Sequence, residues 1–399
     1  VSDLTSGTTR PAQIPAGLHL RVVTSMYTIG SGEGRDFVNP VPGEKNSAGT
    51  QEFHFMGPYQ PMGIYLPDQP GPHGLQLVLH GSGNVHSAQI DGEGLRQQFG
   101  EERNRILISP LARGPSGWYS DISERDVLDA LDDAIDRYDI DTDKVFAGGY
   151  SMGGYGAMRM AMLYPHRFAG LLNWVGFTGD TGNTPSYIPP RGLEERPSGA
   201  VGNILNFTRN LRNIPSAHLY AAADELVFSW TALAMQEELE EQEVPFQFYF
   251  HLAEHLTFAI LDDWAKESAY SADWSLVKNP AHITYRTEPW QAFPEYQIIH
   301  NKAYWLSEIS GRETEKGDYV DIDITSFACE TERPLYETGE RQGTDPVPWY
   351  SSYREIVGSE PVPQSHGLSG TFQNVADLLI DVGPACLDSA PVHYNFESD

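Results

Sequence analysis

Residues 146–156 read FAGGYSMGGYG, which places a serine among five glycines. The preceding DKVF suits a short buried strand, and the following YGAMRMAMLYPHRF has apolar residues at helical spacing. The glycines therefore predict a sharp turn from strand to helix rather than a loose surface loop. Gly149, Ser151 and Gly153 fit the pattern G-x-S-x-G, in which small neighbours let a serine with strained backbone angles stand exposed at such a turn.

The rest of the chain from Leu75 onward alternates short apolar runs with helical stretches. The strand-like runs are LQLVLH, RILISPLA, FAGLLNWVGF, HLYAAAD and FQFYFH, and helices are expected at about 124–138, at about 230–242 and from about 256. Before them, HLRVVTSMYTI and EFHFMGPYQPMGIYLPD have the pattern of antiparallel edge strands. This order predicts an α/β fold built on a doubly wound, mostly parallel sheet.

The pattern changes after Asp273. Segments such as AHITYRTEP, GDYVDIDITSFA and NVADLLIDV alternate with period two, which predicts a catalytic domain over 1–278 followed by a β-rich accessory domain over 279–399. In DIDIT the aspartates lie opposite the isoleucines, as in a strand with one face in water. We favour that interpretation over a calcium site, the alternative for this cluster of acidic residues: Asp318, Asp321 and Asp323.

An insertion rich in Gly, Pro, Asn and Arg occupies residues 178–215, with one helical pattern in VGNILNFTRNLRN. Because it follows a strand of the predicted sheet, it is expected either to cap the site as a lid or to form a long surface loop.

The composition excludes several classes of partner. The chain has 55 acidic against 26 basic residues, a net charge of −29, so nucleic acids and anionic membranes are poor partners. No apolar run reaches the roughly 18 residues that span a bilayer, so we expect a protein without membrane insertion. The sequence printed from Val1 shows no charged, apolar leader, so we expect that any signal peptide has been removed or was never present.

Two cysteines, Cys329 and Cys386, are the only ones in the chain. A disulfide between them would fit a secreted protein, whereas two buried thiols would fit a cytosolic one, and the sequence slightly favours the disulfide. No C-x-x-C motif or Cys/His cluster indicates zinc, and we expect no metal or organic cofactor.

A serine hydroxyl needs a general base and an orienting acid, which follow in the order Ser, Asp or Glu, His for this kind of turn. HLYAAADELVF ends an apolar strand at Asp224, which is preferred as the acid over the adjacent Glu225. A helix N-cap is the structural alternative for Asp224. FYFHLAEHLTFA offers His251 and His255, and His255 is preferred as the base because it stands beyond the strand, whereas His251 fits a core histidine.

Acyl transfer also needs N–H donors aimed at the oxygen that becomes negative in the tetrahedral intermediate. LVLHGSGNVH places small residues directly after a strand, so we assign this oxyanion hole to the N–H groups of Ser82 and Met152. The His80 side chain is expected to brace the loop. Four aromatic residues are weaker candidates for lining a substrate pocket, with core packing as the alternative: Trp118, Tyr119, Tyr150 and Trp174.

In this order and spacing, HGSG, GYSMGG, DELV and EHLTF resemble the α/β-hydrolase superfamily over about residues 52–268. DVLDALDDAIDRYDIDTDKVFAGGYSMGGYGAMRMAMLYPHRFAG is similar to its esterase and polyhydroxybutyrate-depolymerase branch, and to the catalytic domains of prolyl-oligopeptidase relatives. The resemblance implies a triad of Ser151, Asp224 and His255. No blade-like repeats precede the triad in the printed chain, unlike in prolyl oligopeptidases proper.

The sequence thus predicts a secreted or surface-exposed serine ester hydrolase that works through an acyl-enzyme. Its expected substrate is a small-molecule or polymeric ester, with polyesters and aromatic-acid esters as candidates. Two alternatives stay open: a serine peptidase on the same scaffold, and a non-catalytic protein whose C-terminal domain binds a polymer or partner.

Overall fold

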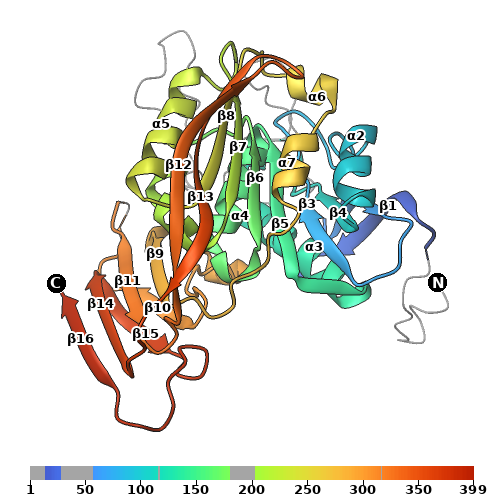
Figure 1. Ribbon diagram of the computed structural model, residues 1–399. Coiled ribbons are helices and arrows are strands. Elements are labelled where there is room, and N and C mark those ends of the chain that lie inside the picture. The colour runs from blue at the N-terminus through green and yellow to red at the C-terminus, as the bar shows by residue number, and fades with distance from the viewer. Residues whose placement is uncertain (1–13, 28–56, 116, 180–202, 316) are drawn as a thin grey trace.

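A ten-stranded sheet runs through the protein in the order β1-β2-β4-β3-β5-β6-β7-β8-β13-β12 (Figure 1). The computed structural model describes residues 14–27, 57–115, 117–179, 203–315 and 317–399. The first eight strands are β1 (Gly17–Thr24), β2 (Tyr59–Leu66), β3 (His73–Leu77), β4 (Arg105–Pro110), β5 (Ile140–Tyr150), β6 (Gly170–Trp174), β7 (Ser216–Ala221) and β8 (Phe246–His251). Strands β4, β3, β5, β6, β7 and β8 are parallel, and β1 and β2 form an antiparallel edge, so the predicted α/β sheet is confirmed.

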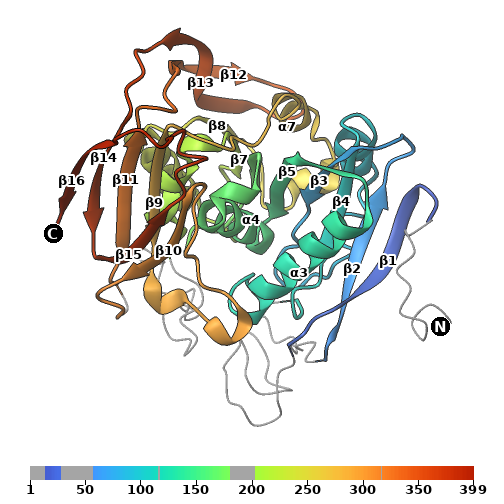
Figure 2. The ribbon, with the colours of Figure 1, turned by 90° about the horizontal axis from the view of Figure 1, so that it is seen from below.

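Helices cover both faces of this sheet (Figure 2). One face carries α3 (Ile122–Arg137), α4 (Met152–Leu163), η3 (Ile204–Asn213) and α5 (Ser229–Glu241), whose apolar residues share one core. The other carries η1 (Arg96–Glu101), α6 (Thr257–Leu261) and α7 (Ala265–Tyr270) over a second core. The shorter helices are α2 (Glu93–Leu95), η2 (Pro165–Arg167), η4 (Pro289–Gln291) and η5 (Pro294–Tyr296). All of α4 is buried, which explains the nearly continuous apolar run that follows the glycines.

Residues after 279 build a smaller β-rich unit with its own apolar core. Its four-stranded sheet has the order β16-β14-β11-β9, and β10 pairs with β15. These strands are β9 (His282–Thr287), β10 (Leu306–Gly311), β11 (Val320–Ser326), β14 (Gly367–Gln373), β15 (Val375–Ile380) and β16 (His393–Ser398). A disulfide joins Cys329 to Cys386, so the favoured interpretation of the cysteines is confirmed.

Residues 332–361 form a long hairpin, here called the arm, that the sequence analysis did not predict. It consists of β12 (Glu332–Gly343) and β13 (Trp349–Pro361). The arm leaves the β-rich unit and runs beside β8, to which β13 pairs antiparallel (Figures 1 and 2). Strand β8 would otherwise be the edge of the main sheet, with unpaired backbone groups. Two strands from the predicted accessory domain, which begins at residue 279, therefore belong to the main sheet.

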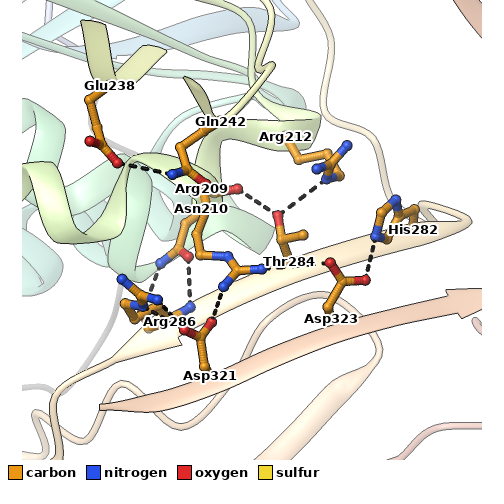
Figure 3. Close-up of polar contacts among 10 residues, drawn as sticks. All are labelled: Arg209, Asn210, Arg212, Glu238, Gln242, His282, Thr284, Arg286, Asp321 and Asp323. Carbon is orange, nitrogen blue, oxygen red and sulfur yellow. Dashed lines mark hydrogen bonds and ion pairs between the residues drawn. The ribbon is translucent and has the colours of Figure 1, made fainter. Parts of the chain in front are cut away.

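The β-rich unit contacts the helices of the main sheet along a polar interface, here called the seam. One part of it lies between η3 and the strands β9 and β11 (Figure 3). Asp321 on β11 binds Arg209 of η3, and its other oxygen accepts a hydrogen bond from Arg286 Nε at 2.7 Å. Asn210 Oδ1 accepts the backbone N–H of Arg286 at 2.7 Å, and Thr284 Oγ1 donates to the Arg209 carbonyl at 2.6 Å.

For Asp321, these contacts correct the expectation that the DIDIT aspartates face water, whereas Asp323 keeps part of its side chain in solvent. Asp321 is only 7% exposed, and Asp323 accepts a hydrogen bond from His282 Nε2 at 2.7 Å. The alternation of apolar and polar residues indicated the right face, but η3 covers this face at Asp321, while the Asp323 side chain stays 39% exposed. The calcium alternative is not supported, because arginines already neutralise Asp321 and the described ranges contain no group of three or more residues suited to a metal.

The second part of the seam is a fully buried ionic cluster around Glu124 of α3. Its carboxylate accepts hydrogen bonds from Arg159 Nε at 2.7 Å, from the Tyr164 hydroxyl at 2.6 Å and from His300 Nε2 at 2.5 Å. Arg159 also donates to Gln291 Oε1 at 2.6 Å. Since His300 and Gln291 follow residue 279, the cluster joins the two parts of the chain.

Most of the insertion predicted at 178–215, the range 180–202, lies outside the described residues. Its last part, Ile204–Asn213, is a 3₁₀ helix that packs against α4 and β9, so this portion docks the β-rich unit. None of the helices in the described ranges is long and apolar enough to span a bilayer.

Candidate active site

Ser151 stands at the turn between β5 and α4 with φ +58° and ψ −117°. This left-handed backbone conformation is uncommon for a residue with a side chain. The serine is anchored on both sides, because its N–H donates to the Trp174 carbonyl at 2.9 Å and its own carbonyl accepts from Tyr155 N–H at 3.1 Å. The predicted strand-to-helix turn is present, and it leaves the serine partly exposed.

Two glycines make this turn sterically possible. A Cβ atom at Gly149 would lie 2.1 Å from the Gly153 carbonyl oxygen, and one at Gly153 would lie 1.9 Å from the Leu79 carbonyl oxygen. No side chain fits at either distance, so the backbone of α4 can approach β5 and the segment after β3 only with glycine at both positions.

A buried acid–base pair lies at the same edge of the sheet. Asp224 follows β7, His255 follows β8, and Asp224 Oδ2 lies 2.7 Å from His255 Nδ1. The other carboxylate oxygen, Oδ1, accepts the N–H groups of Leu226 at 2.8 Å and Val227 at 2.7 Å. The carboxylate is thereby fixed on both sides, with its remaining acceptor directed at the imidazole.

The competing assignments for the acid are distinguished by their contacts. Glu225 is exposed and accepts the backbone N–H of His255 at 3.2 Å, not an imidazole proton. Asp224 is not the N-cap of α5 either, since that helix begins at Ser229 with Phe228 as its N-cap.

Tyr150 links this pair to the turn at Ser151. Its hydroxyl donates to the His255 carbonyl, and its ring packs edge-on against the imidazole at a centroid distance of 5.8 Å. Because Tyr150 precedes Ser151, the histidine is held next to the serine. No hydrogen bond between the Ser151 and His255 side chains is present among the described residues. No sequence pattern indicates this role of the tyrosine, because the role depends on the β8–α6 connection folding over it.

His251 ends β8 and is buried, as predicted for a core histidine. Burial, together with nearby Lys266, lowers the pKa of its imidazole to about 3. Its Nδ1 atom has no hydrogen-bond partner within the described part of the chain, so this core histidine buries one nitrogen without a partner.

The segment after β3 passes against Ser151. A Cβ atom at Gly81 would lie 3.4 Å from Ser151 Cβ. The N–H of Gly83 donates to the Pro115 carbonyl at 2.8 Å, whereas the N–H of Ser82, an exposed residue, has no partner among the described residues. Met152 is the first residue of α4, where helix N–H groups have no intrahelical acceptor. Both predicted oxyanion donors thus lie on backbone that adjoins the serine.

His80 braces this loop, as predicted. It is fully buried, with Nδ1 3.0 Å from the Gly81 carbonyl and Nε2 3.1 Å from the Leu111 carbonyl. Burial lowers the pKa of its imidazole. The ring therefore has a structural role, since it lies between two backbone carbonyls, one of them in the loop beside Ser151.

Three of the four aromatic candidates for a substrate pocket are core residues instead. Tyr119, Tyr150 and Trp174 are at most 2% exposed, and Tyr119 donates to the His80 carbonyl at 2.8 Å. Side chains without exposed surface cannot line an open pocket, although they position the loops that form the site. Trp118 alone is partly exposed, packed edge-on against Tyr155 and Phe177.

A comparison with known protein families matches the part of the chain that carries this site. Residues 118–275 match the prolyl oligopeptidase family model, a range that is less than half of the chain but includes Ser151, Asp224 and His255. No curated protein gives a sequence match.

Solved structures similar to the chain include esterases and peptidases. A thermostable esterase is 16% identical, with 56% of this chain and 62% of that chain covered and a TM-score of 0.43. The fluorophosphonate-binding serine hydrolase F of Staphylococcus aureus is 18% identical, with 56% and 96% covered and a TM-score of 0.44. A dipeptidyl aminopeptidase IV-like protein of Bacteroides ovatus is 13% identical, with 64% and 36% covered and a TM-score of 0.46.

Proposed function

We propose that this protein, which has the α/β-hydrolase fold, is a serine ester hydrolase that works through an acyl-enzyme. The observation that carries the proposal is the hydrogen bond of 2.7 Å between the buried Asp224 carboxylate and His255 Nδ1, at the sheet edge where Ser151 occupies a strained turn. A histidine whose Nδ1 proton is held by a carboxylate presents Nε2 as a base, which is what a weak serine nucleophile requires.

In the proposed reaction, His255 Nε2 removes the Ser151 hydroxyl proton as Oγ attacks the ester carbonyl carbon. The Ser82 and Met152 N–H groups stabilise the resulting oxyanion, and loss of one such donor costs about 3 kcal/mol of transition-state stabilisation. The imidazolium, stabilised by Asp224, protonates the leaving alcohol as the carbon–oxygen bond breaks. Water then attacks the acyl-enzyme with the same assistance and releases the acid.

A serine peptidase is the second candidate, and the match of residues 118–275 to the prolyl oligopeptidase family favours it. We prefer esters because an amide releases a poorer leaving group that must be protonated and because peptide cleavage usually needs the chain to be anchored on both sides of the scissile bond. Small-molecule, polymeric and aromatic-acid esters are the substrates proposed, with Trp118 as a candidate contact. The third candidate is a non-catalytic polymer-binding protein.

We also propose a secreted or extracellular location. The disulfide between Cys329 and Cys386 supports it, because such bonds persist in oxidising compartments. The net charge of −29 agrees with a protein that stays soluble outside the cell and binds neither nucleic acids nor anionic membranes.

Turnover of matched ester and amide substrates tests the proposed function. We expect hydrolysis of p-nitrophenyl butyrate, little hydrolysis of butyryl p-nitroanilide, and loss of both activities and of fluorophosphonate labelling in Ser151→Ala. Comparable amide turnover that is lost in Ser151→Ala would favour the peptidase. A wild-type protein that neither turns over nor labels would favour the binding protein, and labelling that persists in Ser151→Ala would place the nucleophile elsewhere.

A further inference from the structure

The tip of the arm lies against the chain segment that carries His255. In the pairing of β13 with β8, Trp349 is opposite His251, four residues before His255. Figures 1 and 2 show the arm extending from the β-rich unit along β8 to this end of the main sheet. A segment that belongs by sequence to the C-terminal region therefore reaches the candidate active site.

Hydrogen bonds hold the segment 251–255 from two sides. On one side, the His251 carbonyl accepts from Ala222 N–H at 2.7 Å, and the Ala253 carbonyl accepts from Ala223 N–H at 2.9 Å, which ties the segment to the residues before Asp224. On the other side, the Leu252 N–H donates to the Pro348 carbonyl of the arm at 2.8 Å. The base thus follows a segment clamped between β7 and the arm.

Trp349 holds the arm tip in place. Its ring packs edge-on against Tyr249 at 5.5 Å and lies 6.5 Å from the His251 ring, and Lys266 Nζ lies 5.3 Å from its centroid. Both its Nε1–H, at 3.2 Å, and Lys266 Nζ donate to the carbonyl of Asp345 in the arm turn. The indole therefore connects β8, α7 and the turn of the arm.

We propose that the arm is a positioning element of the active site, with Trp349 as its anchor, and that it fixes the His255 imidazole against Asp224. Without the arm, β8 becomes an edge strand and the segment 251–255 keeps support on one side only. Proton transfer depends on the placement of the base to within a fraction of an ångström, so a looser segment slows the chemical step more than it weakens substrate binding. This proposal rests on the role of His255 in the proposed function.

The test is Trp349→Ala, with two readouts. We expect kcat for the ester to fall about tenfold while KM changes less than about twofold. We also expect the downfield proton resonance of the Asp224–His255 hydrogen bond to broaden or disappear, which a loss of remote stability does not cause. Trp349→Phe, which retains an aromatic ring, should restore most of kcat and the resonance.

Val357→Ala is the matched control, because Val357 is on the same strand, is 58% exposed and lies beyond the last pair with β8, Arg354 with Phe246. It should keep both readouts at wild-type values. If Trp349→Ala does not fold, Lys266→Met removes the cation over the indole and should lower kcat about two- to fivefold with the same loss of signal.

The proposal would be overturned if Trp349→Ala kept the wild-type kcat and an unchanged resonance. The same result in Lys266→Met would overturn it if Trp349→Ala does not fold. Equal losses in Val357→Ala would also overturn it, since they would indicate a general effect of the arm on stability. The resonance requires no substrate, so it tests the clamp even if the wild type cleaves no ester, a result that would instead refute the proposed function.

Discussion

The candidate catalytic edge and the seam both bury charged side chains, but they engage them differently. At the edge, Asp224 is held by two backbone N–H groups and one imidazole, and Ser151 keeps a strained backbone and a free hydroxyl. At the seam, Glu124 accepts hydrogen bonds from Arg159, Tyr164 and His300 with no exposure to solvent.

This difference suggests that the edge serves reactivity and the seam serves stability. In the buried cluster at the seam, removal of one charged partner leaves the other buried and uncompensated, so the cluster contributes to stability. At the edge, a serine hydroxyl and an imidazole nitrogen are left available for chemistry. We therefore expect substitutions at the edge to change rates with little change in stability, and substitutions at the seam to do the reverse.

The largest effect tests the edge. Asp224→Asn should lower kcat about ten-thousandfold, because an amide in place of the carboxylate favours the wrong imidazole tautomer. Glu225→Gln, at the neighbouring residue that contacts only the His255 backbone, should retain most activity. Steady-state kinetics on an ester with thermal melts of both variants makes the comparison. A larger loss of kcat in Glu225→Gln than in Asp224→Asn would make Glu225 the acid. A large fall in melting temperature in Asp224→Asn would contradict the expectation that substitutions at the edge change rates but not stability.

The next effect tests the seam. Glu124→Gln leaves the buried Arg159 without a counter-charge, so the free energy of unfolding should fall by about 3–5 kcal/mol while kcat of the folded protein stays near wild type. Denaturant unfolding with activity measured per folded molecule checks this. A variant as stable as wild type would show that the cluster is not what joins the two parts of the chain.

A smaller effect is expected inside the β-rich unit. Reducing the Cys329–Cys386 disulfide, which closes a loop with a sequence separation of 57, should lower the stability of that unit by roughly 2–4 kcal/mol. Mass spectrometry of the unreduced protein establishes whether the bond is formed, and two free thiols would contradict it. Activity should change little below the melting temperature, because the disulfide contacts neither the arm tip nor the triad.

The smallest effect is a pH dependence of stability. Burial by itself would raise the pKa of Glu124, but Arg159 and His300 hold it at about 2, below its ordinary value of 4.5. A carboxyl group with a lowered folded pKa stabilises the protein fully above its unfolded pKa and loses this contribution as the pH falls toward its folded pKa. Between pH 5 and pH 3 we expect this group to account for a loss of about 1–2 kcal/mol.

Denaturant midpoints measured across this range, for wild type and Glu124→Gln, isolate the contribution. The wild type should lose more stability than the variant as the pH falls. Parallel curves would show that other carboxylates dominate the acid response.

The sequence predicted what depends on neighbouring residues. The turn at Ser151 follows from glycines at positions where a Cβ atom would lie about 2 Å from a neighbouring carbonyl oxygen. The strands and helices of the main sheet follow from apolar periodicity. Position after a strand was enough to select Asp224 and His255 as candidates, because the ends of parallel strands meet at one edge. The roles assigned to them remain predictions for the kinetic tests above.

The tertiary structure decided what depends on contacts between distant segments. Periodicity identified the polar face of β11 but could not show that η3 covers it, and the pairing of β13 with β8 relies on backbone hydrogen bonds that nearly any side chains permit. Likewise, only the folded chain showed that Asp224 rather than Glu225 meets the imidazole, and that Tyr150 and Trp174 pack in the core. Steric and periodic constraints act within a few residues and can be read from the sequence, whereas burial and strand pairing depend on segments that approach one another only when the whole chain folds.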